Sequence, residues 1–187
     1  LDRMTQPAQS PLAHETGASP ATHAAQGQPS SLGSASTLQS ASETHAPAQG
    51  PFTFPVRIYW EDTDAGGIVF YANYLKFFER ARTEWLRALG IHQQTLREQT
   101  GGVFVVTDAK LRYLSPARLD DQLIVTASLA EAGRASLTIQ QQAMLVNAHD
   151  AQAAPKLLCE GQIRIGWVDA SSMRPARIPN RILEQLS

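Results

Sequence analysis

The sequence predicts an α+β fold in which one long helix is wrapped by a curved, mostly antiparallel sheet of about five strands. Between residues 74 and 89, apolar side chains recur at steps of three and four, which is the pattern of one helix face. Four later segments alternate apolar and polar residues, as antiparallel strands with one buried face do. The helix is the only sizeable predicted element that can cover this face. Sheet edges left uncovered favour self-association.

The helix is predicted to follow a glycine turn and to end before Gly90, where a helix-ending glycine is expected. Its apolar face consists of Tyr74, Phe77, Phe78, Ala81, Trp85, Ala88 and Leu89. Ahead of the turn, residues 56–60 are rich in β-branched and aromatic side chains and predict the first strand. Residues 91–102 predict a polar connection that ends in two glycines.

Four strands are predicted after this connection. Pro116 ends the first of them, because proline cannot donate to a strand ladder, and in that strand Val105 and Ala109 are expected to share a face. The turn at residues 131–134 predicts a hairpin between the second and third strands. The strands are predicted at residues 103–114, 122–130, 135–146 and 156–168, with a polar loop at 147–155.

Residues 1–53 are predicted to be a disordered low-complexity tail, and residues 54–187 the folded domain. The first fifty residues contain no Ile, Val, Phe, Tyr or Trp. Such a segment cannot bury enough apolar surface to offset the ordering entropy of about 1–2 kcal/mol per residue. The tail holds three histidines whose spacing matches no metal-ligand motif.

Composition narrows the class of protein. The chain has 187 residues and a net charge of −1, with no block of consecutive Lys or Arg, so a nucleic-acid partner is not predicted. Its single cysteine, Cys159, lies in an apolar-alternating segment and is interpreted as a reduced core residue of a cytoplasmic protein. No apolar run approaches the roughly 18 residues of a membrane span, and no secretory signal is expected.

Several short segments together resemble a known family. They are residues 57–58, 63–69 (Thr-Asp-Ala-Gly-Gly-Ile-Val), 74, 78–82 (Phe-Glu-Arg-Ala-Arg) and 113–121 (Tyr-Leu-Ser-Pro-Ala-Arg-Leu-Asp-Asp). This set resembles the hotdog-fold acyl-CoA thioesterases of the 4-hydroxybenzoyl-CoA thioesterase family, especially the bacterial branch encoded beside the Tol–Pal envelope system. Members of that branch often carry histidine at the place of Tyr71.

The resemblance implies a site at the turn before the helix. Asp64 is similar to the family's catalytic aspartate, and it acts either as nucleophile or as general base on water. Tyr71 is expected to offer its backbone N–H to the developing oxyanion, because helix starts carry unsatisfied donors. Gly66 and Gly67 would let the backbone approach the substrate, and Glu79 would help to order the pocket.

The family further implies hydrolysis of an acyl-CoA or acyl-carrier-protein thioester without metal or cofactor, in a homodimer or homotetramer. Other interpretations stay open from the residues. Asp64 is also a common turn former, and Asp62 is expected to be a solvated turn residue. A non-catalytic acyl-CoA-binding protein fits the same fold, and an Asp-x-Asp phosphatase would need a parallel α/β sheet and magnesium. Within the helix, Arg82 is expected to pair with Glu79.

Overall fold

The computed structural model describes residues 50–147 and 152–186, which belong to the compact unit formed by His45–Ser187. In chain order its elements are β1 (Phe52–Arg57), the 3₁₀ helix η1 (Trp60–Asp62), α1 (Asn73–Ala88), α2 (Gln93–Thr100), β2 (Gly102–Tyr113), β3 (Gln122–Ala132), β4 (Ser136–Leu145), β5 (Lys156–Asp169) and α3 (Asn180–Gln185). Strand β1 starts inside the last residues of the predicted tail. The rest of that tail, residues 1–49, lies outside the described residues.

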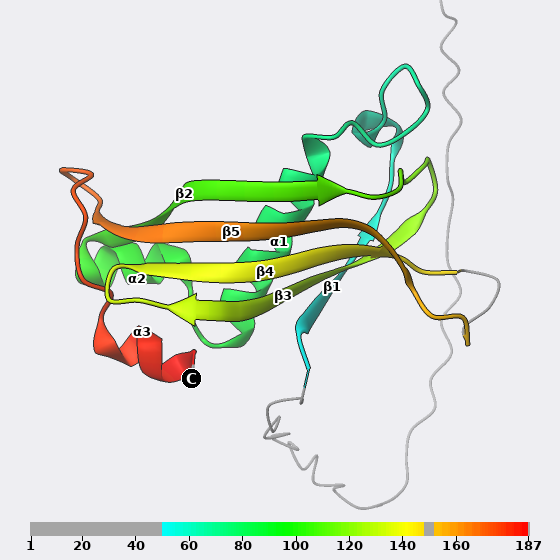
Figure 1. Cartoon of the computed structure of the whole chain (residues 1–187). Coiled ribbons are helices and arrows are strands. Elements are labelled where there is room, and N and C mark those ends of the chain that lie inside the picture. Colours follow the sequence, from blue (N-terminus) through cyan, green and yellow to red (C-terminus); the bar gives the residue numbers. More distant parts are fainter. Residues whose placement is uncertain (1–49, 148–151, 187) are drawn as a thin grey trace, which may run out of the picture. The chain divides into compact units, whose positions relative to one another are not determined.

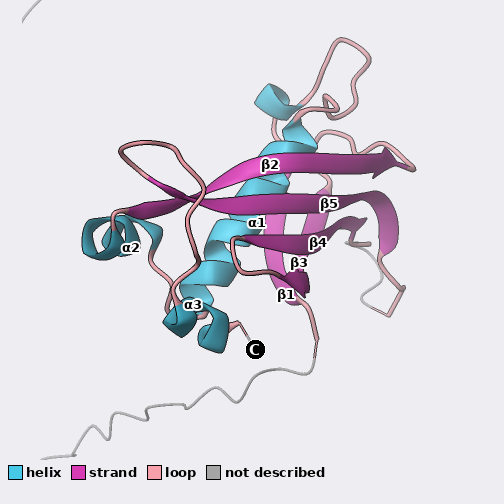
Figure 2. Ribbon diagram, turned by 60° about the vertical axis from the view of Figure 1, so that its left-hand side comes forward, coloured by secondary structure: helices cyan, strands magenta, loops and turns pink. Residues whose placement is uncertain are grey.

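The five strands form one sheet in the order β1-β3-β4-β5-β2, and all neighbouring pairs are antiparallel. Helix α1 crosses one face of this sheet, as Figures 1 and 2 show from two directions. The predicted fold class is therefore confirmed, with the β3–β4 hairpin among its strands. Strands β1 and β2 are the two edges of the sheet. The described strands do not form the parallel sheet that the phosphatase interpretation needs.

The core lies between α1 and the inner face of the sheet. The helix contributes most of its predicted apolar face, in which Phe77 and Phe78 are fully buried. The prediction was wrong for Ala88, which is exposed, and it missed Leu86, which is buried. The strands contribute Leu123, Val125, Leu137, Ile139 and Ile163, all buried. Burying one such side chain stabilises the fold by roughly 1.5–3 kcal/mol. Phe78 packs tightly on β5, where a Cβ added to Gly161 would lie 2.6 Å from its ring.

The first strand lies closer to the N-terminus than the predicted residues 56–60. The strand covers Phe52–Arg57, and the aromatic residues that follow it enter the 3₁₀ helix Trp60–Asp62 instead. Helix α2 was missed because its sequence is polar except for Leu96, the single residue that it buries. The short helix α3 was missed as well, and it buries Ile182.

A β-bulge changes the faces of β2. The register with β5 shifts between Val106 and Asp108, which leaves one extra residue on β2. As a result Val106 lies on the same face as Ala109, and both line a groove beside α1. The prediction that Val105 shares this face was wrong, because strict alternation does not survive an inserted residue.

Candidate active site

The loop before α1 closes on itself as a small hairpin. Thr63 and Val69 form an antiparallel bridge, and the amide of Asp64 donates to the carbonyl of Ile68 at 2.9 Å. Gly67 donates to the carbonyl of Asp64 at 3.0 Å and has a φ of 70°, a left-handed conformation that favours glycine. The turn predicted from the acidic glycine sequence is therefore present, with Asp64 at its start.

The carboxylate of Asp64 is held by its own turn and faces solvent. Its Oδ1 accepts the backbone N–H of Gly66 at 2.8 Å. A Cβ on Gly66 would lie 3.1 Å from this oxygen, so a larger residue there would require the carboxylate to shift. Among the described residues, Oδ2 has no hydrogen-bond donor, so one oxygen stays available to a ligand.

Asp62 has a structural role, and the expectation that it is a solvated turn residue was wrong. It is buried, and its Oδ2 accepts the backbone N–H of Tyr59 at 3.0 Å. Its carbonyl accepts the amide of Phe70 and the side-chain amide of Asn73, each at 2.9 Å. These bonds fasten the loop to the first turn of α1.

Tyr71 lies where the loop enters the helix, and its side chain is 63% exposed rather than part of the core. Its carbonyl accepts the hydroxyl of Tyr113 at 3.2 Å. Among the described residues, the backbone N–H groups of Tyr71 and Ala72 have no acceptor. The start of α1 thus presents free amide donors at its positive dipole end.

A hollow of about 290 Å³ adjoins this helix start. It is lined by Ile68, Val69, Tyr71, Tyr74, Tyr113, Leu114, Ser115 and Pro116. The segment after β2 therefore forms its far wall. Ala117 ties that segment to the loop, because its carbonyl accepts the amide of Val69 at 2.9 Å. The sequence placed these two segments fifty residues apart, and only the fold joins them.

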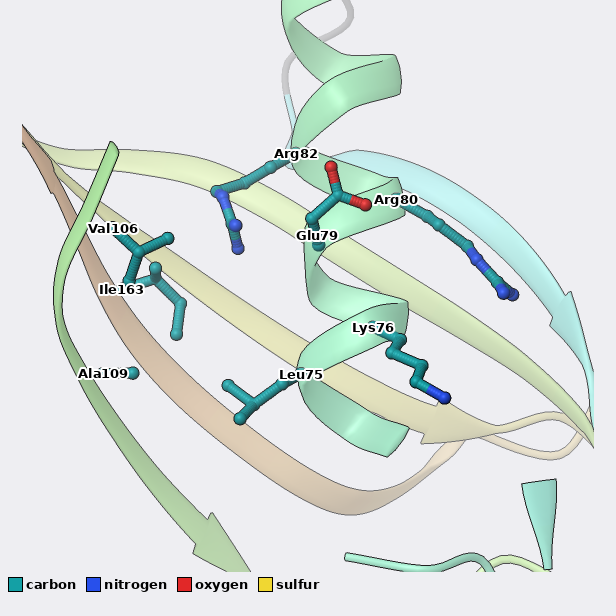
Figure 3. A pocket seen from close by; sticks show the side chains of 8 residues that line it. All are labelled: Leu75, Lys76, Glu79, Arg80, Arg82, Val106, Ala109 and Ile163. Carbon is teal, nitrogen blue, oxygen red and sulfur yellow. The ribbon is translucent and has the colours of Figure 1, made fainter. Parts of the chain in front are cut away.

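A second and larger hollow, the α1–β2 groove, has a volume of about 540 Å³ (Figure 3). It is lined by Leu75, Lys76, Glu79, Arg80, Arg82, Val106, Ala109 and Ile163. Glu79 is exposed here, and its Oε1 accepts the hydroxyl of Thr83 at 2.9 Å. Glu79 follows Tyr71 by eight residues, or roughly 12 Å along a helix. Of the predicted site residues, Tyr71 lines the first hollow and Glu79 the second, whereas Asp64, Gly66 and Gly67 line neither of the two.

Arg82 is buried in the floor of this groove, and its predicted ion pair with Glu79 was wrong. Its Nη1 donates to Oε1 of Gln141 at 2.9 Å, while Nε2 of Gln141 donates to the carbonyl of Phe78, also at 2.9 Å. Burial lowers the pKa of the Arg82 guanidinium. Sequence reasoning missed Gln141, although it occupies an apolar-face position of β4 between Ile139 and Ala143.

Free backbone donors at a helix start are an arrangement that attracts negatively charged groups. A profile described as the thioesterase-like superfamily matches residues 58–186, which is more than half of the chain. The chain belongs to this superfamily. The match includes the loop at residues 63–69 and every helix from α1 to α3.

Two relatives extend this superfamily assignment. The acyl-CoA thioesterase YbgC of Haemophilus influenzae is 42% identical over 131 residues, which are 70% of this chain and 90% of the relative. The acyl-CoA thioester hydrolase YbgC of Escherichia coli is 40% identical over 134 residues, which are 72% of this chain and 94% of the relative.

A solved structure supports the fold of this superfamily member. A 4-hydroxybenzoyl-CoA thioesterase in complex with 4-hydroxybenzoyl-CoA superposes with a TM-score of 0.67 and 19% identity, covering 72% of this chain and 97% of the other. At that identity the likeness shows the fold, which is the hotdog fold that the resemblance implied. None of the described helices has the length and apolar composition of a membrane span.

Proposed function

We propose that the chain is an acyl-CoA thioesterase, which hydrolyses the thioester of an acyl-CoA to a free acid and a thiol. The relatives named above carry this activity in their names. The observation that carries the proposal is that the loop with the exposed carboxylate of Asp64 leads into free backbone donors at the start of α1. Thioester hydrolysis needs both a group that delivers a nucleophile and donors for the carbonyl oxygen.

Asp64 acts in one of two ways. As nucleophile, a carboxylate oxygen bonds to the thioester carbon, the carbon–sulfur bond breaks, and the thiolate leaves with its electron pair; water then cleaves the mixed anhydride. As general base, the carboxylate takes a proton from water while the water oxygen attacks the carbonyl; the tetrahedral intermediate then collapses, the carbon–sulfur bond breaks, and the thiolate leaves with its electron pair. The unpartnered Oδ2 suits either route.

The oxyanion is stabilised by the backbone N–H of Tyr71. This amide has no acceptor among the described residues and lies at the positive end of the helix dipole. Losing one such donor costs on the order of 10²–10³ in rate. Gly66 and Gly67 keep the turn free of side chains, so the protein backbone approaches the substrate closely.

The finer parts of the proposal concern substrate and assembly. Glu79 orders the acyl group from the α1–β2 groove, and the thiol carrier is coenzyme A or an acyl-carrier protein. The enzyme is cytoplasmic, belongs to the Tol–Pal-associated branch and assembles as a homodimer or homotetramer. The unpaired edges of β1 and β2 support self-association.

Thiol release from short aliphatic, long aliphatic and aromatic acyl-CoAs tests the proposal, with Asp64→Asn beside the wild type. We expect the wild type to turn over at least one class and Asp64→Asn to lose about two orders of magnitude or more. Glu61→Gln is the matched control, because Glu61 is an exposed carboxylate of the same segment. Equal rates for wild type and Asp64→Asn would refute the role of Asp64. Absence of turnover with every substrate, together with retained acyl-CoA binding, would favour the non-catalytic alternative.

A further inference from the structure

The floor of the α1–β2 groove contains a buried cation, Arg82, which Glu79 attracts through space without an ion-pair contact. Arg82 is only 8% exposed, and its recorded partner is the neutral side chain of Gln141. In the described part of the chain, the ion pairs are Arg87 with Glu84 and Arg112 with Glu160, so Arg82 has no carboxylate within ion-pair distance. A buried charge in this state is costly and is normally paired.

The remaining donors of Arg82 reach the groove. A guanidinium has five N–H donors, and one of its nitrogens bonds to Gln141. Among the described residues, no side-chain nitrogen or oxygen that is shielded from solvent lacks a hydrogen-bond partner. The other nitrogens of Arg82 are therefore in contact with the space of the groove. They form a planar fork that matches a carboxylate.

The rest of the groove is apolar on the side of this fork. Figure 3 shows Arg82 and Leu75 directed to the side of α1 that faces Val106 and Ile163. The figure also shows Lys76 and Arg80 directed to the other side of the helix. The cation on the apolar side of the groove is therefore Arg82.

The groove lies along the same helix as the proposed oxyanion donor. Tyr71, Leu75, Glu79 and Arg82 follow one another at steps of four, four and three, so they lie along one side of the helix. Eleven residues separate Tyr71 from Arg82, or roughly 16 Å of helix, and helical side chains lean back toward the N-terminus. Because the Arg82 side chain leans back toward Tyr71, the length that an acyl chain must bridge is shorter than this helix segment.

We propose that the α1–β2 groove selects acyl-CoA substrates whose acyl chain ends in a carboxylate. The guanidinium of Arg82 binds the terminal carboxylate, and the methylene groups pack against Leu75, Val106 and Ile163. Gln141 holds the guanidinium in place from behind. This inference rests on the proposed thioesterase function and adds the substrate class to it.

Octanoyl-CoA and suberoyl-CoA test the proposal, because they have acyl chains of equal length and differ in the terminal carboxylate. The measured quantity is the ratio of kcat/KM for suberoyl-CoA to kcat/KM for octanoyl-CoA. We expect the wild type to favour suberoyl-CoA and Arg82→Met to lower the ratio about tenfold or more, as the loss of a charge-assisted hydrogen bond does. Arg80→Gln, which removes a cation on the other side of α1, should keep the wild-type ratio.

A second variant tests the proposal even if Arg82→Met does not fold. Val106 is 55% exposed, so Val106→Glu should fold and place a carboxylate on the groove wall to compete for Arg82. We expect it to lower the ratio as well. A ratio near one in the wild type, or an unchanged ratio in both variants, would overturn the inference. Turnover of octanoyl-CoA in the same experiment would leave the thioesterase proposal intact. Arg82→Met could instead dissociate an oligomer and leave the ratio of kcat/KM values unchanged. This result would mean that the guanidinium contacts a second copy of the chain, and it would also overturn the inference. No hydrolysis of either substrate would overturn this inference, and the thioesterase proposal falls with it only if the short aliphatic, long aliphatic and aromatic acyl-CoAs are not hydrolysed either.

Discussion

The hydroxyl of Tyr74 accepts the backbone N–H of Ala117 at 3.1 Å, and both residues are buried. Ala117 also accepts the amide of Val69, and its neighbour Arg118 forms a bridge with Ile68. The first turn of α1 therefore holds the segment after β2, and that segment holds the loop of Asp64. Burial raises the pKa of the Tyr74 hydroxyl, so this group stays protonated at neutral pH.

Removing this hydroxyl should destabilise the protein. In Tyr74→Phe the buried N–H of Ala117 loses its acceptor, which costs about 1–3 kcal/mol. Urea unfolding measures the loss. Tyr113→Phe is the control, because its hydroxyl is on an exposed residue, and its loss should be smaller. Equal stability of Tyr74→Phe and the wild type would show that water replaces the hydroxyl.

Replacing Gln141 should be more costly than replacing its neighbour on β4. Gln141→Leu leaves the buried guanidinium of Arg82 without its recorded partner, and we expect a loss on the order of 3 kcal/mol. Gln142→Leu changes a half-buried position on the opposite face and should have little effect. Chemical denaturation of both variants checks this order, and a reversed order would contradict the assigned role of Gln141.

Adding one methyl group to Gly161 should overpack the core. The new Cβ would lie 2.6 Å from Cε2 of Phe78, so α1 or the ring must shift. Overpacking of this kind costs about 1–3 kcal/mol. At Gly50 an added Cβ meets no atom within 4 Å, so Gly50→Ala serves as the control. The difference in melting temperature between the two variants is the measurement; an unchanged value for Gly161→Ala would mean that the interface yields easily.

The buried thiol of Cys159 should make stability fall at alkaline pH. Burial raises its pKa to about 12 from an ordinary 9.0. Between these values the unfolded chain loses the proton and the folded chain keeps it, so the free energy of unfolding falls as pH rises, by at most about 1.4 kcal/mol per pH unit. Below pH 9.0 this contribution is constant. Urea unfolding on both sides of pH 9.0 should give a steeper fall for the wild type than for Cys159→Ala, and equal slopes would contradict it.

Periodicity was enough to predict the helix and the four later strands within a few residues, because one-sided burial imposes its period on the sequence. Prediction from periodicity failed where burial imposes little or no period on the sequence. Helix α2 buries little besides Leu96, so it has no apolar face to detect. The bulge between Val106 and Asp108 depends on pairing with β5, which no local pattern reports.

The sequence by itself determined the fold class, the long helix and the acidic glycine turn with Asp64, because local residue preferences and spacing encode these features. Only the tertiary structure decided that Asp62 is buried, that Arg82 bonds to Gln141 rather than Glu79, and that the segment at Ala117 supports the site loop. Each of these contacts joins groups whose partner is set by how the elements pack in space. The energies of hydrogen bonding and desolvation depend on which groups lie close together in the fold. They do not depend on how far apart those groups are in the sequence.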